Sequence, residues 1–448
     1  MFANSLVQFR RYQVLAACAV FFLLALGQIS PARAQLTKED RERAREMLDS
    51  AKDDIKKNYY DPNFRGIDLE ARFQEARQKL DKATTNGQMF GVIAQLMLDL
   101  KDSHTYFVPP ARAASVEYGW QMQMIGDKCY VVAVKPGSDA DAKGLKPGDL
   151  IHTVAGFSPS RQNLWILQYL IYALRPQPSL KVVLQSPGAA EPRELEVMAK
   201  IGPVKKSLDM NGPLGDWQDL IREAQNEARL YAHRYYELGD DVLVWKMPQF
   251  DLSKLGVDEM MDKAKKRKAI ILDLRGNGGG AEETLLRMIG NFIDHDVTVG
   301  ELKRRKETKP LVAKTRGGDG VFKGQLVVLI DSNSGSSSEV FSRTMQLEKR
   351  ATIIGDRSAG AVMRSRSYSH HIGTEVVVYY GTSITDADVI MSDGVSLEGV
   401  GVMPDEVLLP TAADMAAGRD PVMVAAFARL GLKIDPEKAG ALFPVKWK

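Results

Sequence analysis

The chain has 448 residues and a mass of 49.6 kDa. This is more than one compact domain usually contains, so the length predicts about two or three domains. With 44% hydrophobic and 26% charged residues it has enough apolar side chains for ordinary cores, which excludes an intrinsically disordered protein. The 60 Lys and Arg against 57 Asp and Glu leave a net charge of +3, too small for a surface that neutralises a nucleic-acid backbone, so we expect no nucleic-acid partner.

The N-terminus has the three regions of a secretory signal peptide. A basic pair, Arg10-Arg11, precedes an apolar run over residues 14–26, and Ala32-x-Ala34 has the small side chains that signal peptidase accepts. As a helix the run would extend about 20 Å, shorter than the roughly 30 Å hydrocarbon core of a bilayer. We therefore expect residues 1–34 to be removed and the protein to be exported to the periplasm or the extracellular space.

Two other interpretations of this segment remain. Leu15-Ala16-Ala17-Cys18 matches a lipobox, although its cysteine lies inside the apolar run, and Arg10-Arg11 could begin a twin-arginine signal, although the usual flanking residues are missing. Removal of the segment would leave Cys129 as the single cysteine of the sequence. This excludes an intrachain disulfide and a cysteine-based zinc cluster. No later segment has about 18 consecutive apolar residues, so we expect no stable membrane span after signal cleavage.

Residues 35–115 are predicted to form a helical domain. Leu48, Ile55 and Tyr59 recur at helical spacing, a proline interrupts the pattern at residue 62, and residues 89–100 form a second apolar face.

Residues 116–200 are predicted to form a β-rich domain. Strand-like runs at 130–134 and 180–184 are separated by Gly and Pro turns, and between them residues 135–151 read KPGSDADAKGLKPGDLI. This stretch closely resembles the PDZ domains of bacterial proteases, in which a strand, a short helix and a Gly-Leu-x-x-Gly-Asp turn form one side of a peptide groove. The resemblance implies that an extended peptide pairs with an open sheet edge while backbone amides bind its C-terminal carboxylate. The alternative is a small β domain without this activity.

Residues 201–240 are predicted to be a connector with a helix over 217–231. Residues 241–410 are predicted to form an α/β core, and residues 411–448 a C-terminal helical tail. The core is predicted because apolar strand-like runs alternate with helical patterns. The predicted strands are 242–245, 269–274, 326–330 and 376–380, and the predicted helices are 282–293 and 338–347. Ligands of such sheets bind at the strand ends, so the residues that follow each strand are candidates for a site.

A glycine-rich turn follows the second predicted strand. Residues 273–280 read DLRGNGGG, and glycines allow backbone N–H groups to approach a ligand closely. Gly276-x-Gly278-x-x-Ala281 also fits a dinucleotide fingerprint, but it lies in the middle of the chain and lacks a mononucleotide-binding half. A nucleotide-dependent enzyme is therefore the remotest alternative.

A serine-rich turn follows the third predicted strand and leads into a helix. Residues 331–339 read DSNSGSSSE. A serine on a strand-to-helix turn is exposed, and the helix N-terminus offers amide donors to a developing oxyanion. A purely structural interpretation is a capping box formed by Ser336 and Glu339.

The order of helices, PDZ segment, glycine turn and serine turn resembles the carboxyl-terminal processing protease and tricorn core protease family, serine peptidases with a PDZ domain ahead of an α/β catalytic core. The resemblance covers residues 50–410. It implies an α/β catalytic core with crotonase/ClpP-like β-α layers, an inserted PDZ domain and an N-terminal helical domain. It further implies Ser336 as the nucleophile, with an oxyanion hole formed by Gly278 or Gly279 and by Ser337.

The two branches of this family differ in their catalytic base. Processing proteases use a lysine downstream of the serine, but Ala361 stands at that position here, so no Ser/Lys dyad can form there. The tricorn branch uses a histidine preceded by a serine, before the PDZ domain, and a glutamate near the end of the core. Ser103-His104 and Glu398 match these motifs, and the resemblance implies that they are catalytic.

These assignments are chemically consistent. A neutral imidazole can remove the proton of a serine hydroxyl near neutral pH, so His104 could activate Ser336. Glu398 could orient that imidazole and stabilise its charged form through Ser103. For the other histidines we expect surface or capping positions. A metal site at residues 370–371 would need carboxylate partners, which the sequence does not place.

The sequence therefore predicts an exported serine endopeptidase that acts on protein or peptide substrates, recognised by their C-termini, without a metal ion or cofactor. The alternative is a relative of the same fold that binds peptides or other ligands without hydrolysing them.

Overall fold

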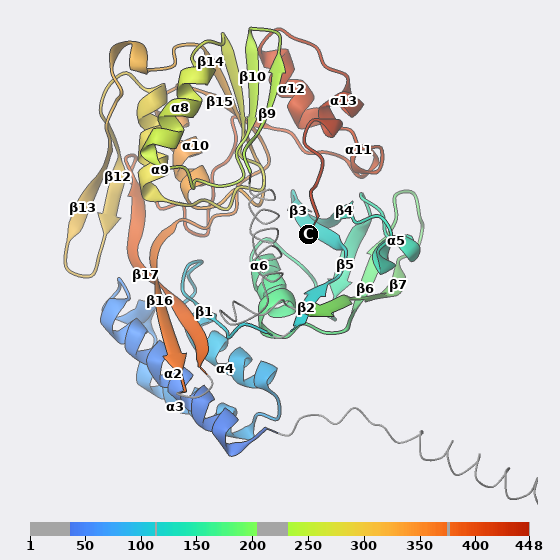
Figure 1. The fold of residues 1–448 in the computed structure, drawn as a ribbon, viewed down its shortest axis with the longest axis vertical. Coiled ribbons are helices and arrows are strands. Elements are labelled where there is room, and N and C mark those ends of the chain that lie inside the picture. Colours follow the sequence, from blue (N-terminus) through green and yellow to red (C-terminus); the bar gives the residue numbers. More distant parts are fainter. Residues whose placement is uncertain (1–35, 113, 204–231, 374–376, 448) are drawn as a thin grey trace, which may run out of the picture.

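The computed structural model describes residues 36–112, 114–203, 232–373 and 377–447 (Figure 1). The predicted signal peptide over 1–34 and the predicted helix over 217–231 lie outside these residues. Within the described residues no helix is long and apolar enough to cross a bilayer. The described chain begins with a group of N-terminal helices. These are followed by a β-rich module over 114–203 and by α/β layers from residue 232 onward.

The N-terminal helices are α2 (Lys38–Asn58), α3 (Leu69–Lys82) and α4 (Asn86–Leu98), with the short turn η1 (Phe64–Gly66) after the first. A reciprocal capping box starts α2, because Thr37 and Asp40 accept each other's backbone N–H through their side chains. The apolar faces meet in one core that includes Leu48, Ile55 and Phe73.

A five-stranded sheet connects these helices to the rest of the molecule. Its order is β1-β17-β12-β13, with β16 paired to β17, and a long hairpin of β16 and β17 reaches the helices (Figure 1). The strands are β1 (Tyr106–Val108), β12 (Val297–Lys303), β13 (Thr308–Ala313), β16 (Met363–Ile372) and β17 (Val378–Met391). Ile372, Tyr380 and Ile384 of the hairpin are buried in the core of the N-terminal helices, so hairpin and helices pack as one unit.

The predicted strand over 376–380 begins at a residue outside the described ones, and it is shorter than β17, which starts at Val378. β17 continues to Met391, and Thr382 and Thr385 in its middle are fully buried although they are polar. A hydrophobic pattern therefore could not show the length of this strand, nor its partner β16, whose residues are mostly polar or charged.

The β-rich module contains a five-stranded antiparallel sheet in the order β3-β4-β5-β6-β7. Its strands are β3 (Trp120–Ile125), β4 (Lys128–Val134), β5 (Leu150–Val154), β6 (Ser179–Gln185) and β7 (Arg193–Met198). The helices are α5 (Asp139–Ala142) and α6 (Leu164–Gln168), which continues as η2 (Tyr169–Leu174). At the base of the module, β2 (Ala114–Glu117) pairs with β8 (Lys200–Pro203). β3 is an edge strand of the larger sheet.

The central sheet has the order β18-β15-β14-β11-β10-β9. Its strands are β9 (Arg234–Leu238), β10 (Val242–Lys246), β11 (Ala269–Asp273), β14 (Gln325–Ile330), β15 (Thr352–Gly355) and β18 (Glu406–Val407). All neighbours from β10 to β18 are parallel, and β9 is antiparallel to β10. β11 is buried along its whole length, as expected for a parallel strand that is covered on both faces.

Helices cover both faces of this sheet (Figure 1). On one face lie α8 (Lys254–Ala264), α9 (Glu282–Phe292) and α10 (Ser337–Leu347), and η3 (Gly318–Gly320) precedes β14. The C-terminal helices are α11 (Ala412–Ala416), α12 (Pro421–Arg429) and α13 (Pro436–Ala441). Met423 and Phe427 of α12 are fully buried against the other face, so the helices predicted as a tail form a layer of the core.

Candidate active site

Ser336 lies in the turn between β14 and α10, where its backbone adopts φ 52° and ψ −119°. A non-glycine residue in this region is strained by about 1–3 kcal/mol, and such strain is concentrated at functional sites. Ser336 is also the N-cap of α10, and Glu339 Oε2 accepts its N–H at 2.9 Å, as the capping-box interpretation predicted. The side chain is partly exposed, so a ligand can reach it.

The glycine turn lies directly against this serine. β11 and β14 are parallel neighbours, so the turns that follow them lie at the same edge of the sheet. Gly279 has φ +105°, and a Cβ atom there would lie 2.5 Å from Ser336 Cβ. Only glycine fits at this position, because any side chain would collide with Ser336.

The backbone N–H groups of this region differ in their partners. Gly279 N–H donates to Asn277 Oδ1 at 2.8 Å and is therefore occupied. The N–H groups of Gly278 and Ser337 donate no hydrogen bond to any described residue. Of the three predicted oxyanion donors, Gly278 and Ser337 are thus available to a ligand, whereas Gly279 supports the turn.

Glu339 is completely buried and holds the neighbouring loop against Ser336. Its carboxylate accepts hydrogen bonds from the N–H groups of Gly360 and Ala361 at 2.7 and 2.9 Å and from Ser358 Oγ at 2.6 Å. Burial raises the pKa of Glu339 to about 7, although these donors favour the carboxylate. Sequence reasoning named Glu339 only as a cap, since nothing in the sequence showed that the loop after β15 returns to it.

The predicted histidine, serine and glutamate form a hydrogen-bonded row. Ser103 Oγ lies 2.7 Å from His104 Nδ1 and donates to Glu398 Oε2 at 2.8 Å, and Glu398 Oε1 accepts the Ser103 N–H at 2.7 Å. A hydroxyl that gives its one proton to a carboxylate must accept from the imidazole, so the proton of neutral His104 is on Nδ1. Nε2 then carries a lone pair, as a general base requires.

Burial lowers the pKa of His104 below its usual value, whereas the charge of Asp102 acts in the opposite direction. Burial also raises the pKa of Glu398, and the hydrogen bonds from Ser103 and from the Val362 N–H counteract this. The neutral imidazole is therefore favoured at neutral pH.

Asp102 fixes the turn that carries Ser103 and His104. It is 4% exposed, and Oδ1 accepts the N–H groups of His104 and Thr105 at 3.0 and 2.7 Å and the Thr385 hydroxyl at 2.7 Å. The Tyr59 hydroxyl donates to Oδ2 at 2.8 Å. Sequence reasoning quoted Asp102 as part of the motif but gave it no function, because its partners include Tyr59, which follows α2, and Thr385 of β17.

The two parts of the candidate site meet at residues 361 and 362. Ser336 N–H donates to the Ala361 carbonyl at 2.8 Å, and the next residue, Val362, donates its N–H to Glu398 Oε2 at 2.8 Å. Ala361 is thus in direct contact with the predicted nucleophile. The Ser336 hydroxyl and the His104 imidazole are both described, and no hydrogen bond joins them.

The β-rich module contacts the loops next to the serine. Gln123 Nε2 donates to Asp331 Oδ2 at 2.7 Å, and the Arg161 guanidinium binds both oxygens of Asp356 at 2.6 Å. Arg161 and Asp356 are both nearly buried, so loss of either partner would leave an uncompensated charge. None of these contacts could be predicted from the spacing of the motifs.

The other histidines have local partners. His370 Nε2 lies 2.7 Å from Asp54 Oδ2, where a carboxylate partner was not expected, and its ring stacks on Tyr380. Among the described residues, no group of three or more His, Cys, Asp or Glu side chains is arranged to hold a metal ion.

Residues 241–408 match the model of peptidase family S41, and residues 40–97 match that of the tricorn protease C1 domain. The chain is 27% identical over 288 residues to the tail-specific protease of Haemophilus influenzae, covering 59% of this chain and 38% of the relative. It is 24% identical over 344 residues to a Staphylococcus aureus protein named "Probable CtpA-like serine protease", covering 74% of this chain and 60% of the relative. The chain therefore spans less than two thirds of the length of either protein.

Among solved structures, that of mature CPAF covers 85% of this chain and 95% of its own, with a TM-score of 0.61 and 16% identity. This likeness shows a shared fold. The chain has the peptidase S41 fold with mixed α/β content and several sheets, and the predicted family resemblance is confirmed.

Proposed function

We propose that this chain, which carries a peptidase family S41 domain after a tricorn protease C1 domain, is an exported serine endopeptidase that acylates Ser336. One observation carries the proposal: the Ser103 hydroxyl bridges His104 Nδ1 and Glu398, which leaves Nε2 as the basic nitrogen. The serine, histidine, second serine and glutamate correspond in kind and order to the tricorn branch of the family.

In the proposed reaction, His104 Nε2 takes the proton of the Ser336 hydroxyl as Oγ attacks the scissile carbonyl. The imidazolium is stabilised by Glu398 through Ser103, and it then gives its proton to the leaving amine. A water molecule hydrolyses the acyl-enzyme with His104 again acting as base. Since hydrogen bonds between nucleophile and base are often long in ligand-free enzymes, the contact between Ser336 and His104 forms when substrate is bound.

The oxyanion of each tetrahedral intermediate is bound by the N–H groups of Gly278 and Ser337. This choice between the two glycines follows from the hydrogen bond that already occupies the Gly279 N–H. Preorganised donors of this kind are each worth about a hundredfold to a thousandfold in kcat.

The β-rich module acts in this proposal as a PDZ domain that selects substrates by their C-terminal segments. Its edge strand β3 lies beside the helical stretch that begins with α6, since Gln168 Nε2 donates to the Met122 carbonyl at 3.4 Å. An extended peptide can pair with such an edge, as in strand addition. Deletion of residues 118–200 should impair cleavage of long substrates more than of short peptides, whereas an equal loss would contradict substrate selection by the module.

Export is supported by the signal-like pattern of residues 1–34. N-terminal mass analysis of the protein secreted from its host should give Gln35 as the first residue. A lipidated N-terminus at Cys18 would contradict this part of the proposal.

Cleavage of a peptide library by a protein that starts at Gln35, with Ser336→Ala as the control, tests the proposed activity. We expect products from the unchanged protein and none from the variant. The second candidate is a non-hydrolytic peptide-binding relative, which the missing hydrogen bond between Ser336 and His104 favours. Failure of a fluorophosphonate probe to modify Ser336, together with peptide binding without cleavage, would support that candidate instead.

A further inference from the structure

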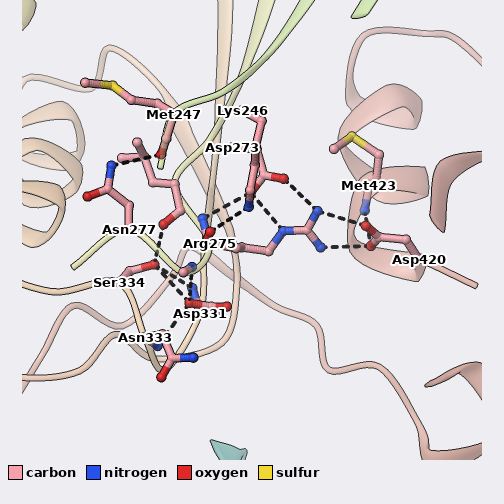
Figure 2. Close-up of polar contacts among 12 residues, drawn as sticks. Lys246, Met247, Asp273, Arg275, Asn277, Asp331, Asn333, Ser334, Asp420 and Met423 are labelled. Atoms are coloured by element: carbon pink, nitrogen blue, oxygen red, sulfur yellow. Dashed lines mark hydrogen bonds and ion pairs between the residues drawn. The ribbon is translucent and has the colours of Figure 1, made fainter. Parts of the chain in front are cut away.

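The C-terminal segment, which follows the part of the chain that matches peptidase family S41, contacts the glycine turn through Asp420 (Figure 2). Asp420 is the N-cap of α12, and its Oδ1 accepts the Met423 N–H at 2.9 Å. The same carboxylate binds the Arg275 guanidinium, with Nη1–Oδ1 at 3.0 Å and Nη2–Oδ2 at 2.8 Å. One side chain thus begins a helix of the C-terminal layer and contacts the first residue of the turn after β11.

Arg275 is held from its other side by Asp273, the last residue of β11. Nε and Nη2 of Arg275 donate to the two oxygens of Asp273 at 2.9 Å each, and Asp273 is 1% exposed. Figure 2 shows the guanidinium between the two carboxylates. Paired contacts of this kind fix the direction of a guanidinium as well as its position.

A half-buried lysine completes the cluster. Lys246 Nζ, from the end of β10, donates to the Arg275 carbonyl at 2.6 Å and lies 3.1 Å from Asp273 Oδ1. The cluster contains two cations and two anions, so its formal charges balance. Asp273 is buried and the other three members are half-buried, so removal of one partner leaves a charge that is poorly compensated, which distorts its surroundings.

Further hydrogen bonds hold the residues of the turn that follow Arg275. Gly276 N–H donates to Asp331 Oδ1 at 2.9 Å, and Asn277 Nδ2 donates to the Met247 carbonyl at 2.9 Å. Gly278 lies between Asn277 and Gly279, which are joined by the hydrogen bond described above. The direction of the unoccupied Gly278 N–H is therefore determined by the backbone on either side, and Arg275 is where that backbone leaves the sheet.

We propose that Asp420 is a positioning residue for the reaction. By holding Arg275 it keeps the glycine turn in the conformation that directs the Gly278 N–H at the oxyanion. The inference rests on the proposed function, and it extends the structure needed for catalysis into the C-terminal layer.

The test is Asp420→Asn, because asparagine is as good an N-cap as aspartate but weakens the ion pair with Arg275. We expect kcat to fall about tenfold to a hundredfold with KM within about twofold, since a displaced oxyanion donor acts in the transition state. Asp435→Asn is the matched control: Asp435 is the N-cap of α13, and its carboxylate is bonded to the N–H groups of Glu437 and Lys438. This control should keep the kcat of the unchanged protein.

The same proteins are also reacted with a fluorophosphonate, and modification of Ser336 is followed by intact mass. If the unchanged protein is not modified and cleaves no peptide, the proposed function fails. If the unchanged protein is active and Asp420→Asn has an equal or higher kcat, the proposed function stands and the positioning inference is overturned.

Asp420→Glu provides a second comparison should Asp420→Asn fail to fold. It keeps the charge but moves the carboxylate by one methylene group, so we expect a smaller loss in kcat of about threefold to tenfold at an unchanged KM. A lower melting temperature with an unchanged kcat would show that the cluster only stabilises the fold, which overturns the inference.

Discussion

The two halves of the proposed active site are held in different ways. The Ser336 half is built from turns at the ends of neighbouring parallel strands, and its supports, such as Asn277 and Glu339, lie in the same α/β core. The His104 half is assembled from distant parts of the chain, because Asp102 is bonded to Tyr59 of the N-terminal helices and to Thr385 of β17. The geometry of the serine is thus set by the fold of one core, whereas that of the base depends on how the N-terminal helices pack on the β16–β17 hairpin.

The largest effect is expected when either half of the proposed site loses its reacting group. His104→Ala should reduce kcat by about four to six orders of magnitude, as should Ser336→Ala, and the double variant should be no worse, because nucleophile and base act as a unit. Steady-state kinetics on a cleaved library peptide measure this. His152→Ala, an exposed histidine of β5 near Gln185, is the control and should be unaffected. Additive losses in the double variant would show that the two halves do not work together.

Ser103→Ala should sharpen the comparison, because it removes the link between His104 and Glu398 and leaves both in place. Loss of the group that orients and stabilises the imidazolium should lower kcat by about two to four orders of magnitude. Ser115→Ala, an exposed serine of β2, should leave kcat unchanged. An equally active Ser103→Ala protein would mean that Glu398 does not act through Ser103.

Asp102→Asn tests whether the His104 half depends on its buried anchor. Asparagine keeps one oxygen for the three donors at Oδ1, but its amide nitrogen replaces Oδ2 and cannot accept the hydrogen bond of the Tyr59 hydroxyl, which costs about 1–3 kcal/mol. We expect a lower melting temperature and a loss in kcat of about tenfold or more, because the turn that carries the base is displaced. An unchanged kcat in a destabilised protein would show that the position of His104 is independent of Asp102.

The smallest effect is expected from His370→Ala, because His370 is not bonded to any of the proposed reacting groups. The substitution removes the imidazole that is bonded to buried Asp54 of α2 and stacked on Tyr380 of the hairpin. The melting temperature should fall, while kcat at 25 °C should stay within about twofold, since Thr382 still donates to Asp54. If kcat fell as strongly as in Asp102→Asn, the helices and the hairpin would have to be much less rigid than their common core indicates.

Much of the Ser336 half could be predicted from the sequence, because its residues are close together in the chain and follow strongly apolar strands. The strands β10, β11 and β14 and the helices α9 and α10 were predicted to within about two residues. The choice between Gly278 and Gly279 was not predictable, since it depends on a hydrogen bond to the Asn277 side chain.

The supports of the His104 half could not be predicted in this way. Ser103 and His104 were found only through the family resemblance. β1 was missed because it has only three residues, β16 because its residues are mostly polar, and most of β17 because buried polar residues interrupt its apolar pattern. Asp420 lies in helices that were predicted as a tail, so its contact with Arg275 had no signal in the sequence. Contacts between segments more than a hundred residues apart require the structure.

The pH dependence of Ser336 phosphonylation tests the central claim, that His104 is the base, most directly. Burial lowers the pKa of His104, and the neutral imidazole is the active form, so the rate should fall as the pH is lowered, with a midpoint under the usual value of about 6.5. Intact-mass measurement of the fluorophosphonate adduct between pH 4.5 and 8, on the unchanged protein and on His104→Ala, gives this midpoint. We expect one acid limb in the unchanged protein and a rate near zero at every pH in the variant. A limb that persists in His104→Ala, or a rate that rises only at alkaline pH as for a lysine base, would contradict the account.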